Sequence, residues 1–161
     1  MKAAWTALAI LLALLVQSTL SHVIPDYARI VDPFLLVLVY CGLTGGETHG
    51  MLAGAAAGWV QDVHFGGPVV GLSGLTKVLV GFGVGLAGTR FLLTGPLPRL
   101  LVVFGAALVD ALLFERLALV FEIPVGALSA AGLFTRAASN AVAGSIAFEA
   151  IDRRFRHEAR S

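Results

Sequence analysis

The sequence predicts an all-α membrane protein, a bundle of about six transmembrane helices. Of its 161 residues, 58% are hydrophobic and 13% are charged, whereas about 25% are charged in a typical soluble domain. The mean hydropathy is +0.90. Apolar runs approach the ~20 residues that cross a bilayer as a helix, and glycine, proline and charged residues separate them. We expect one transmembrane domain over residues 1–151 and a basic cytoplasmic tail over 152–161.

Six apolar runs define the expected helices. The first is interpreted as a membrane helix and not as a signal peptide, because it is long and no clear cleavage site follows it. The second and third are short for a core of about 30 Å. They form either two thin helices, which we favour, or one re-entrant hairpin that leaves four full spans. In chain order the runs are 3–24, 34–44, 51–63, 69–93, 100–121 and 125–151.

The basic residues predict the orientation. An even number of spans places both termini on one side, together with Lys2, Arg90, Arg99 and the arginines of the tail. Arg29 and Arg116 fall on the other side. Because cytoplasmic loops are enriched in lysine and arginine, we expect both termini in the cytoplasm. The segments expected on the outer side are 26–32, 64–68 and 115–123.

Four ionisable side chains lie inside the apolar runs: Asp62, Lys77, Asp110 and Arg136. An unpaired charge at the bilayer centre costs about 3 kcal/mol on insertion scales, so two acids and two bases favour mutual neutralisation. Asp110 and Arg136 each lie 11 residues into their segments, or about 16 Å deep. Asp62 and Lys77 both fall in the outer half of the membrane. We predict two pairs, Asp110–Arg136 and Asp62–Lys77. The alternative interpretation is a proton or ion path, or a polar ligand cavity.

Small and polar residues recur around these charges at steps of three and four, which lie on one helical face. Asn140 follows Arg136 by one such step and is expected in the same intramembrane polar network. In lipid, small residues let helix backbones approach each other closely. The residues expected at helix contacts are Gly50, Gly54, Gly58, Gly81 and Gly85.

No motif in the chain supports catalysis, a cofactor or a metal. The segment 83–88 matches GxGxxG, but it lies inside an apolar run and lacks the strand–turn–helix context of a dinucleotide site. The histidines are scattered without ligand spacing, and the chain has a single cysteine. The net charge of +1 gives no case for nucleic-acid binding. We therefore expect a protein that is not an enzyme, without cofactor, metal or nucleic-acid partner.

Three landmarks stand in a characteristic order. Asp62 ends the third run before a glycine-containing turn, Asp110 lies inside the apolar segment 108–114, and Asn140 precedes basic residues at 153–156. In this order and spacing, the chain resembles the MreD family, the rod shape-determining membrane proteins. The turn is one residue longer than the commonest family form, and the resemblance does not extend to Lys77 or Arg136. The turn residues are Gly66, Gly67, Pro68 and Gly71.

The resemblance implies a non-enzymatic scaffold of the bacterial cell-elongation complex in the inner membrane. The partners it implies are MreC, then RodA and a class B penicillin-binding transpeptidase in a larger complex for peptidoglycan synthesis, as well as membrane lipid. The family is also similar to the membrane-embedded substrate-binding subunits of energy-coupling-factor vitamin transporters, which are six-helix bundles. This similarity leaves an alternative function, a small-molecule binding subunit with an outward cavity lined by Asp62 and Lys77.

Overall fold

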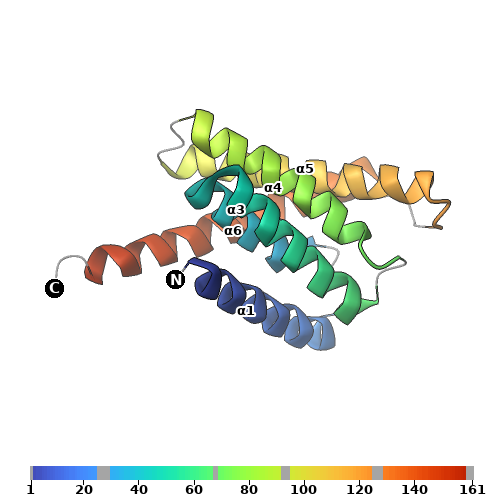
Figure 1. Cartoon of the computed structure of the whole chain (residues 1–161), viewed down its shortest axis with the longest axis horizontal. Coiled ribbons are helices and arrows are strands. Elements are labelled where there is room, and N and C mark those ends of the chain that lie inside the picture. The colour runs from blue at the N-terminus through green and yellow to red at the C-terminus, as the bar shows by residue number, and fades with distance from the viewer. Residues whose placement is uncertain (1, 25–29, 67–68, 92–94, 125–128, 159–161) are drawn as a thin grey trace.

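The computed structural model describes residues 2–24, 30–66, 69–91, 95–124 and 129–158, without the side chains of Lys2 and of 154–158. This part of the chain is all helical (Figure 1), as predicted. Within these residues, three helices are long and apolar enough to cross a membrane: α1, α4 and α5. The described helices are α1 (Lys2–Val23), α3 (Pro33–Phe65), α4 (Leu72–Arg90), α5 (Pro96–Val120) and α6 (Ala130–Glu158).

Helix α3 contains two of the expected helices and folds back on itself. At Gly46 the backbone leaves helical geometry, with φ 79° and ψ −170°, a region open essentially to glycine alone. Phe34 and Phe65 then meet with their ring centroids 6.3 Å apart, although an unbroken helix would separate them by roughly 45 Å. The six-helix bundle is therefore not supported: the described residues form five elements, and the second and third runs are the two helical halves of α3, which meet at the Gly46 kink without a loop.

Both ends of α3 carry local signals that explain where the helix starts and stops. Asp32 is its N-cap, and its carboxylate accepts hydrogen bonds from the backbone N–H groups of Phe34 and Leu35. Pro33 occupies the first turn, where its missing N–H is not needed. At the other end Gly66 takes a left-handed conformation with φ 65° and donates its N–H to the Asp62 carbonyl, as a helix C-cap does.

The glycines expected at helix contacts let the second half of α3 pack closely against α4. A Cβ added at Gly54 would overlap the carbonyl oxygen of Lys77, and one added at Gly58 would lie 2.5 Å from the carbonyl oxygen of Ser73. Only residues without a side chain allow backbones to meet this closely. All five glycines expected at helix contacts lie at this interface: Gly50, Gly54, Gly58, Gly81 and Gly85.

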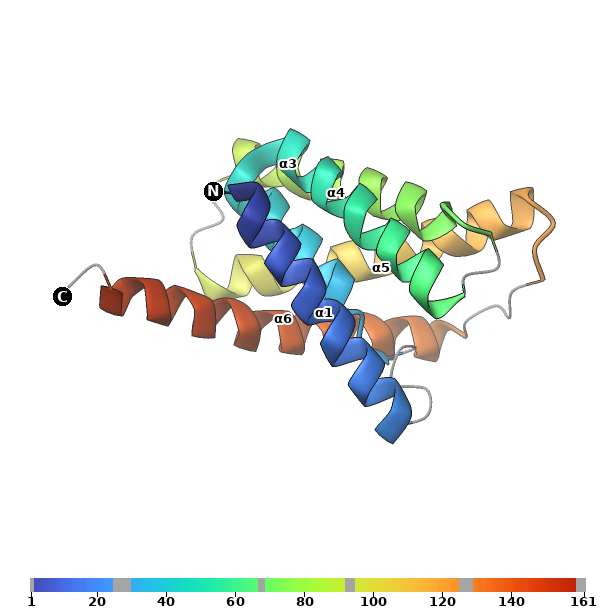
Figure 2. The same cartoon turned by 60° about the horizontal axis from the view of Figure 1, so that its bottom comes forward.

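One end of the molecule gathers both chain termini. Figures 1 and 2 show the start of α1 and the end of α6 at the same end. Thr6 of α1 contacts His49 just past the α3 turn, and Arg99 of α5 pairs with Asp152 of α6. We call this the terminal end. Helix α6 runs without a break through the expected tail boundary at 151/152. Arg29, Gly67 and Pro68 lie outside the described residues.

Candidate functional site

The charge cluster consists of Asp32, Lys77, Asp110 and Arg136. Lys77 Nζ lies 2.8 Å from Asp32 Oδ2 and 3.7 Å from Asp110 Oδ2. Arg136 Nη2 lies 3.3 Å from Asp110 Oδ2 and 3.7 Å from Asp32 Oδ2. Each base therefore faces both acids. The predicted Asp110–Arg136 pair is present, within a larger group than a single pair.

The cluster is buried, electrically balanced and shared by four helices. The side chains of Asp32, Lys77 and Asp110 are at most 3% exposed, and that of Arg136 is 19% exposed. Removing charges from water is costly unless opposite charges and hydrogen bonds compensate, and here two acids meet two bases. The members come from the N-cap of α3 and from α4, α5 and α6. The arrangement can therefore hold these helices in register.

Asp32 is the member that sequence reasoning missed. We expected it in the outer loop 26–32, because proline and charged residues interrupt the apolar sequence at 25–33. Its side chain is in fact completely buried. The sequence did carry a signal. An aspartate followed directly by a proline is a common start of a helix, with the aspartate as N-cap and the proline at the first position. Asp32 thus serves both α3, as its cap, and the cluster, as a charged member.

Asn140 fixes the segment that carries Asp32. Its Oδ1 accepts a hydrogen bond from the backbone N–H of Asp32 at 2.9 Å. Its Nδ2 donates to the carbonyl oxygens of Ile30 at 3.1 Å and of Arg136 at 2.8 Å. The side chain is fully buried. A buried amide is stable only when its polar atoms are paired, so Asn140 ties the entry to α3 to helix α6, one turn from Arg136.

The predicted Asp62–Lys77 pair is wrong. The Asp62 carboxylate accepts hydrogen bonds from the backbone N–H groups of Gly71 at 2.8 Å, Ser73 at 3.1 Å and Gly74 at 3.4 Å. These groups lie at the start of α4, where helical N–H groups have no partner within the helix and a negative charge is favoured. Asp62 thus caps α4 from the last turn of α3. The long side chain of Lys77 reaches Asp32 instead.

No group of three or more metal-ligating side chains is found among the described residues. Of the cluster atoms, Asp110 Oδ1 and Arg136 Nε are buried without a hydrogen-bond partner.

Comparison with known protein families assigns the chain. Residues 1–140 match the family described as rod shape-determining protein MreD. The chain belongs to the MreD family. All four cluster members and Asn140 lie within the matched residues, while the basic tail lies beyond them.

Membership in the MreD family indicates a structural membrane protein with a role in rod-shape determination. No curated protein matches the chain, and no solved structure does either. The expected likeness to the substrate-binding subunits of energy-coupling-factor transporters therefore has no support.

Proposed function

We propose that this MreD-family protein is a non-enzymatic scaffold of the cell-elongation complex in the bacterial inner membrane. In this proposal it binds MreC and connects it to RodA and a class B penicillin-binding transpeptidase for peptidoglycan synthesis. One observation carries the proposal: the interior charges pair with one another across four helices. The interior thus serves to hold the fold, and the lipid-facing surfaces are left for partners.

The proposed orientation places both termini in the cytoplasm. Arg90 ends α4, Arg99 lies in the first turn of α5, and Arg153 lies near the end of α6. These residues belong to the terminal end, while Arg116 lies near the opposite end of α5. A concentration of arginine on one side is typical of the cytoplasmic face, and this supports the proposal.

Helix α1 offers the proposed surface for MreC. Among the described helices it packs only on α3, and just 17% of its apolar span is buried within the protein. Its outer face presents Leu8, Leu12 and Leu15, which are 46%, 53% and 55% exposed. A single transmembrane helix can pack against such a face through van der Waals contacts, which suits the one span of MreC.

The test is a site-specific photo-crosslinking scan in living cells. A photoreactive residue replaces Leu12 on α1 or, as the matched control, Leu101 on α5, which is 59% exposed. We expect position 12 to crosslink to MreC and position 101 to give a much weaker product. A strong product at 101 alone would move the partner surface to α5 while leaving the scaffold intact. No MreC product from either position, with a bound vitamin or an ATPase module recovered instead, would contradict the scaffold.

A further inference from the structure

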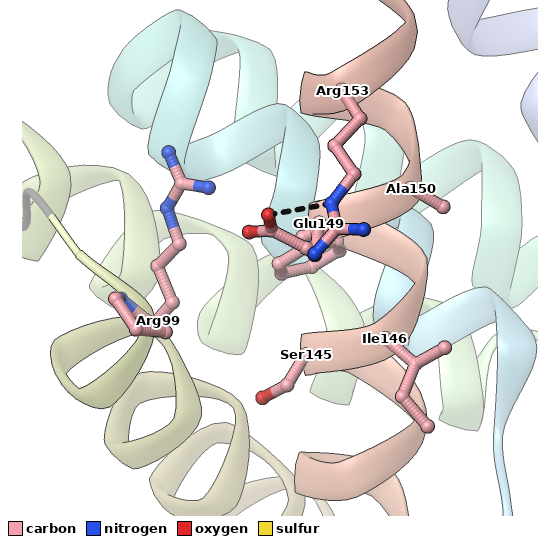
Figure 3. Close-up of a pocket in the computed structure, with 8 residues that line it drawn as sticks. Arg99, Ser145, Ile146, Glu149, Ala150 and Arg153 are labelled. Carbon is pink, nitrogen blue, oxygen red and sulfur yellow. Dashed lines mark hydrogen bonds and ion pairs between the residues drawn. The ribbon is translucent and has the colours of Figure 1, made fainter.

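A groove of about 660 Å³ lies between the start of α5 and the last turns of α6. Its polar lining includes Arg99 of α5 and Glu149 and Arg153 of α6, and its apolar lining includes Ile146 and Phe148 of α6. Figure 3 shows Arg99 extending beside Glu149, which Arg153 contacts from one turn further along α6. We call this feature the α5–α6 groove. It is separate from the charge cluster, since the two share no residue.

The groove offers both cationic and anionic groups. Arg153 Nε donates to Glu149 Oε1 at 2.9 Å, and Arg99 pairs with Asp152. An arginine carries five N–H donors, so one ion pair leaves further donors on each guanidinium. The side chains of Arg153 and Glu149 are 73% and 45% exposed and remain accessible to a ligand. Two guanidinium groups from neighbouring helices suit a phosphate, and the carboxylate beside them suits an ammonium.

The position of the groove matches the level of lipid headgroups. Arg99 lies in the first turn of α5, a helix long and apolar enough to cross the membrane, so it marks the membrane surface at the terminal end. Ile146 is 66% exposed and lies about one turn before Glu149 on α6. The polar groups therefore stand at the surface, and an apolar side chain lies deeper, where acyl chains begin.

We propose that the α5–α6 groove binds a zwitterionic phospholipid of the phosphatidylethanolamine type. Its phosphate contacts Arg99 and Arg153, its ammonium contacts Glu149, and an acyl chain follows Ile146. The charged lining residues are Arg99, Arg153 and Glu149, and Asp152, which lies outside the lining, pairs with Arg99. With this partner included the charges sum to zero, so the group gives an anionic lipid no net attraction. A headgroup with both signs uses both kinds of partner. The proposal is independent of the scaffold function.

Native mass spectrometry of the full chain in mild detergent tests this site. Phosphatidylethanolamine, phosphatidylglycerol and inorganic phosphate are added separately. We expect the wild-type protein to retain phosphatidylethanolamine in preference to the other two. Arg153→Gln removes an exposed guanidinium from the groove, and Glu149→Gln removes the partner of the ammonium. Loss of a hydrogen bond to a charged group predicts binding weaker by about tenfold or more for each variant.

The matched control is Arg116→Gln, which makes the same change near the other end of α5 and should bind phosphatidylethanolamine like the wild type. An unchanged elution profile on size exclusion verifies that each variant is folded. The proposal is overturned if phosphatidylglycerol or phosphate binds as tightly as phosphatidylethanolamine, or if the two groove variants bind like the control. Equal loss in all three variants would also overturn it, since the effect would then not be specific to the groove.

Discussion

Replacing Lys77 with methionine tests whether the charge cluster stabilises the fold. The change keeps an unbranched side chain, one heavy atom shorter, and removes its charge. Asp32 then loses a partner at 2.8 Å and Asp110 loses one at 3.7 Å, and water cannot compensate because both acids are at most 3% exposed. Breaking a buried ion pair costs about 3–5 kcal/mol. Because Arg136 still faces both acids, we expect a loss at the lower end, about 3 kcal/mol.

A second substitution shows which acid Lys77 neutralises. In Lys77→Met/Asp32→Asn the cluster loses one acid and one base, and Asp110 with Arg136 remains as a balanced pair. Asparagine also remains a good N-cap for α3. We therefore expect this double variant to recover most of the lost stability, with a coupling free energy of about 2 kcal/mol. The matched control, Lys77→Met/Asp62→Asn, should show additive losses to within about 0.5 kcal/mol, since Asp62 contacts the start of α4.

The assay is the free energy of unfolding in mixed micelles, measured by titration with a denaturing detergent and followed by far-UV circular dichroism. All variants are compared in the same micelles. The reasoning is refuted if Lys77→Met leaves the unfolding free energy unchanged. It is also refuted if Lys77 couples more strongly to Asp62 than to Asp32, which would restore the pairing expected from the sequence.

Three further substitutions probe the other contacts by the same unfolding measurement. Gly54→Ala forces a Cβ against the carbonyl oxygen of Lys77 and should lower the unfolding free energy by about 1–3 kcal/mol. In the control Gly83→Ala the added Cβ meets open space, so this change should cost nothing. Equal losses of stability in the two variants would contradict the close packing at Gly54. Asp62→Ala removes the cap of α4 and should cost about 1–2 kcal/mol, and Asp62→Asn should cost less. An unchanged midpoint of the detergent unfolding curve for Asp62→Ala would show that Asp62 does not cap α4. Asn140→Leu leaves the Asp32 N–H without its partner and removes the side-chain donor to the carbonyl oxygens of Ile30 and Arg136. It should cost more than about 2 kcal/mol, and a smaller loss would contradict the role of Asn140 in fixing the segment that carries Asp32.

Sequence reasoning succeeded where regular helix geometry decides the outcome. Asp110 and Arg136 lie on the continuous helices α5 and α6, so counting residues at a constant rise placed them at matching levels, and their side chains meet at 3.3 Å. Gly50, Gly54 and Gly58 recur at steps of four, so they fall on one face and form one close contact with α4. Both predictions needed only the helical period and rise.

The remaining features depend on contacts that periodicity does not encode. Counting along a helix gives depth but not the neighbouring helix, and Asp62 and Lys77 were paired on depth alone. Asp62 lies at the last turn of α3, so it caps α4, and Lys77 is left for Asp32. A glycine-containing break between the second and third runs is present at Gly46, but periodicity did not show that its backbone geometry turns α3 back on itself. Asp32 looked like a loop residue because its burial arises only after that reversal and the docking of Asn140.

The central claim is that the interior charges hold the fold and take no part in transport or ligand binding. The most direct test is complementation by Lys77→Met/Asp32→Asn in a rod-shaped bacterium depleted of its own MreD-family protein. The amount of the variant in the membrane and the midpoint temperature of its thermal unfolding are measured in parallel to verify that it is folded. The account predicts that cells keep a wild-type ratio of length to width. Rounded cells, in the presence of folded variant at wild-type level, would contradict it and show that these charges act directly in the function.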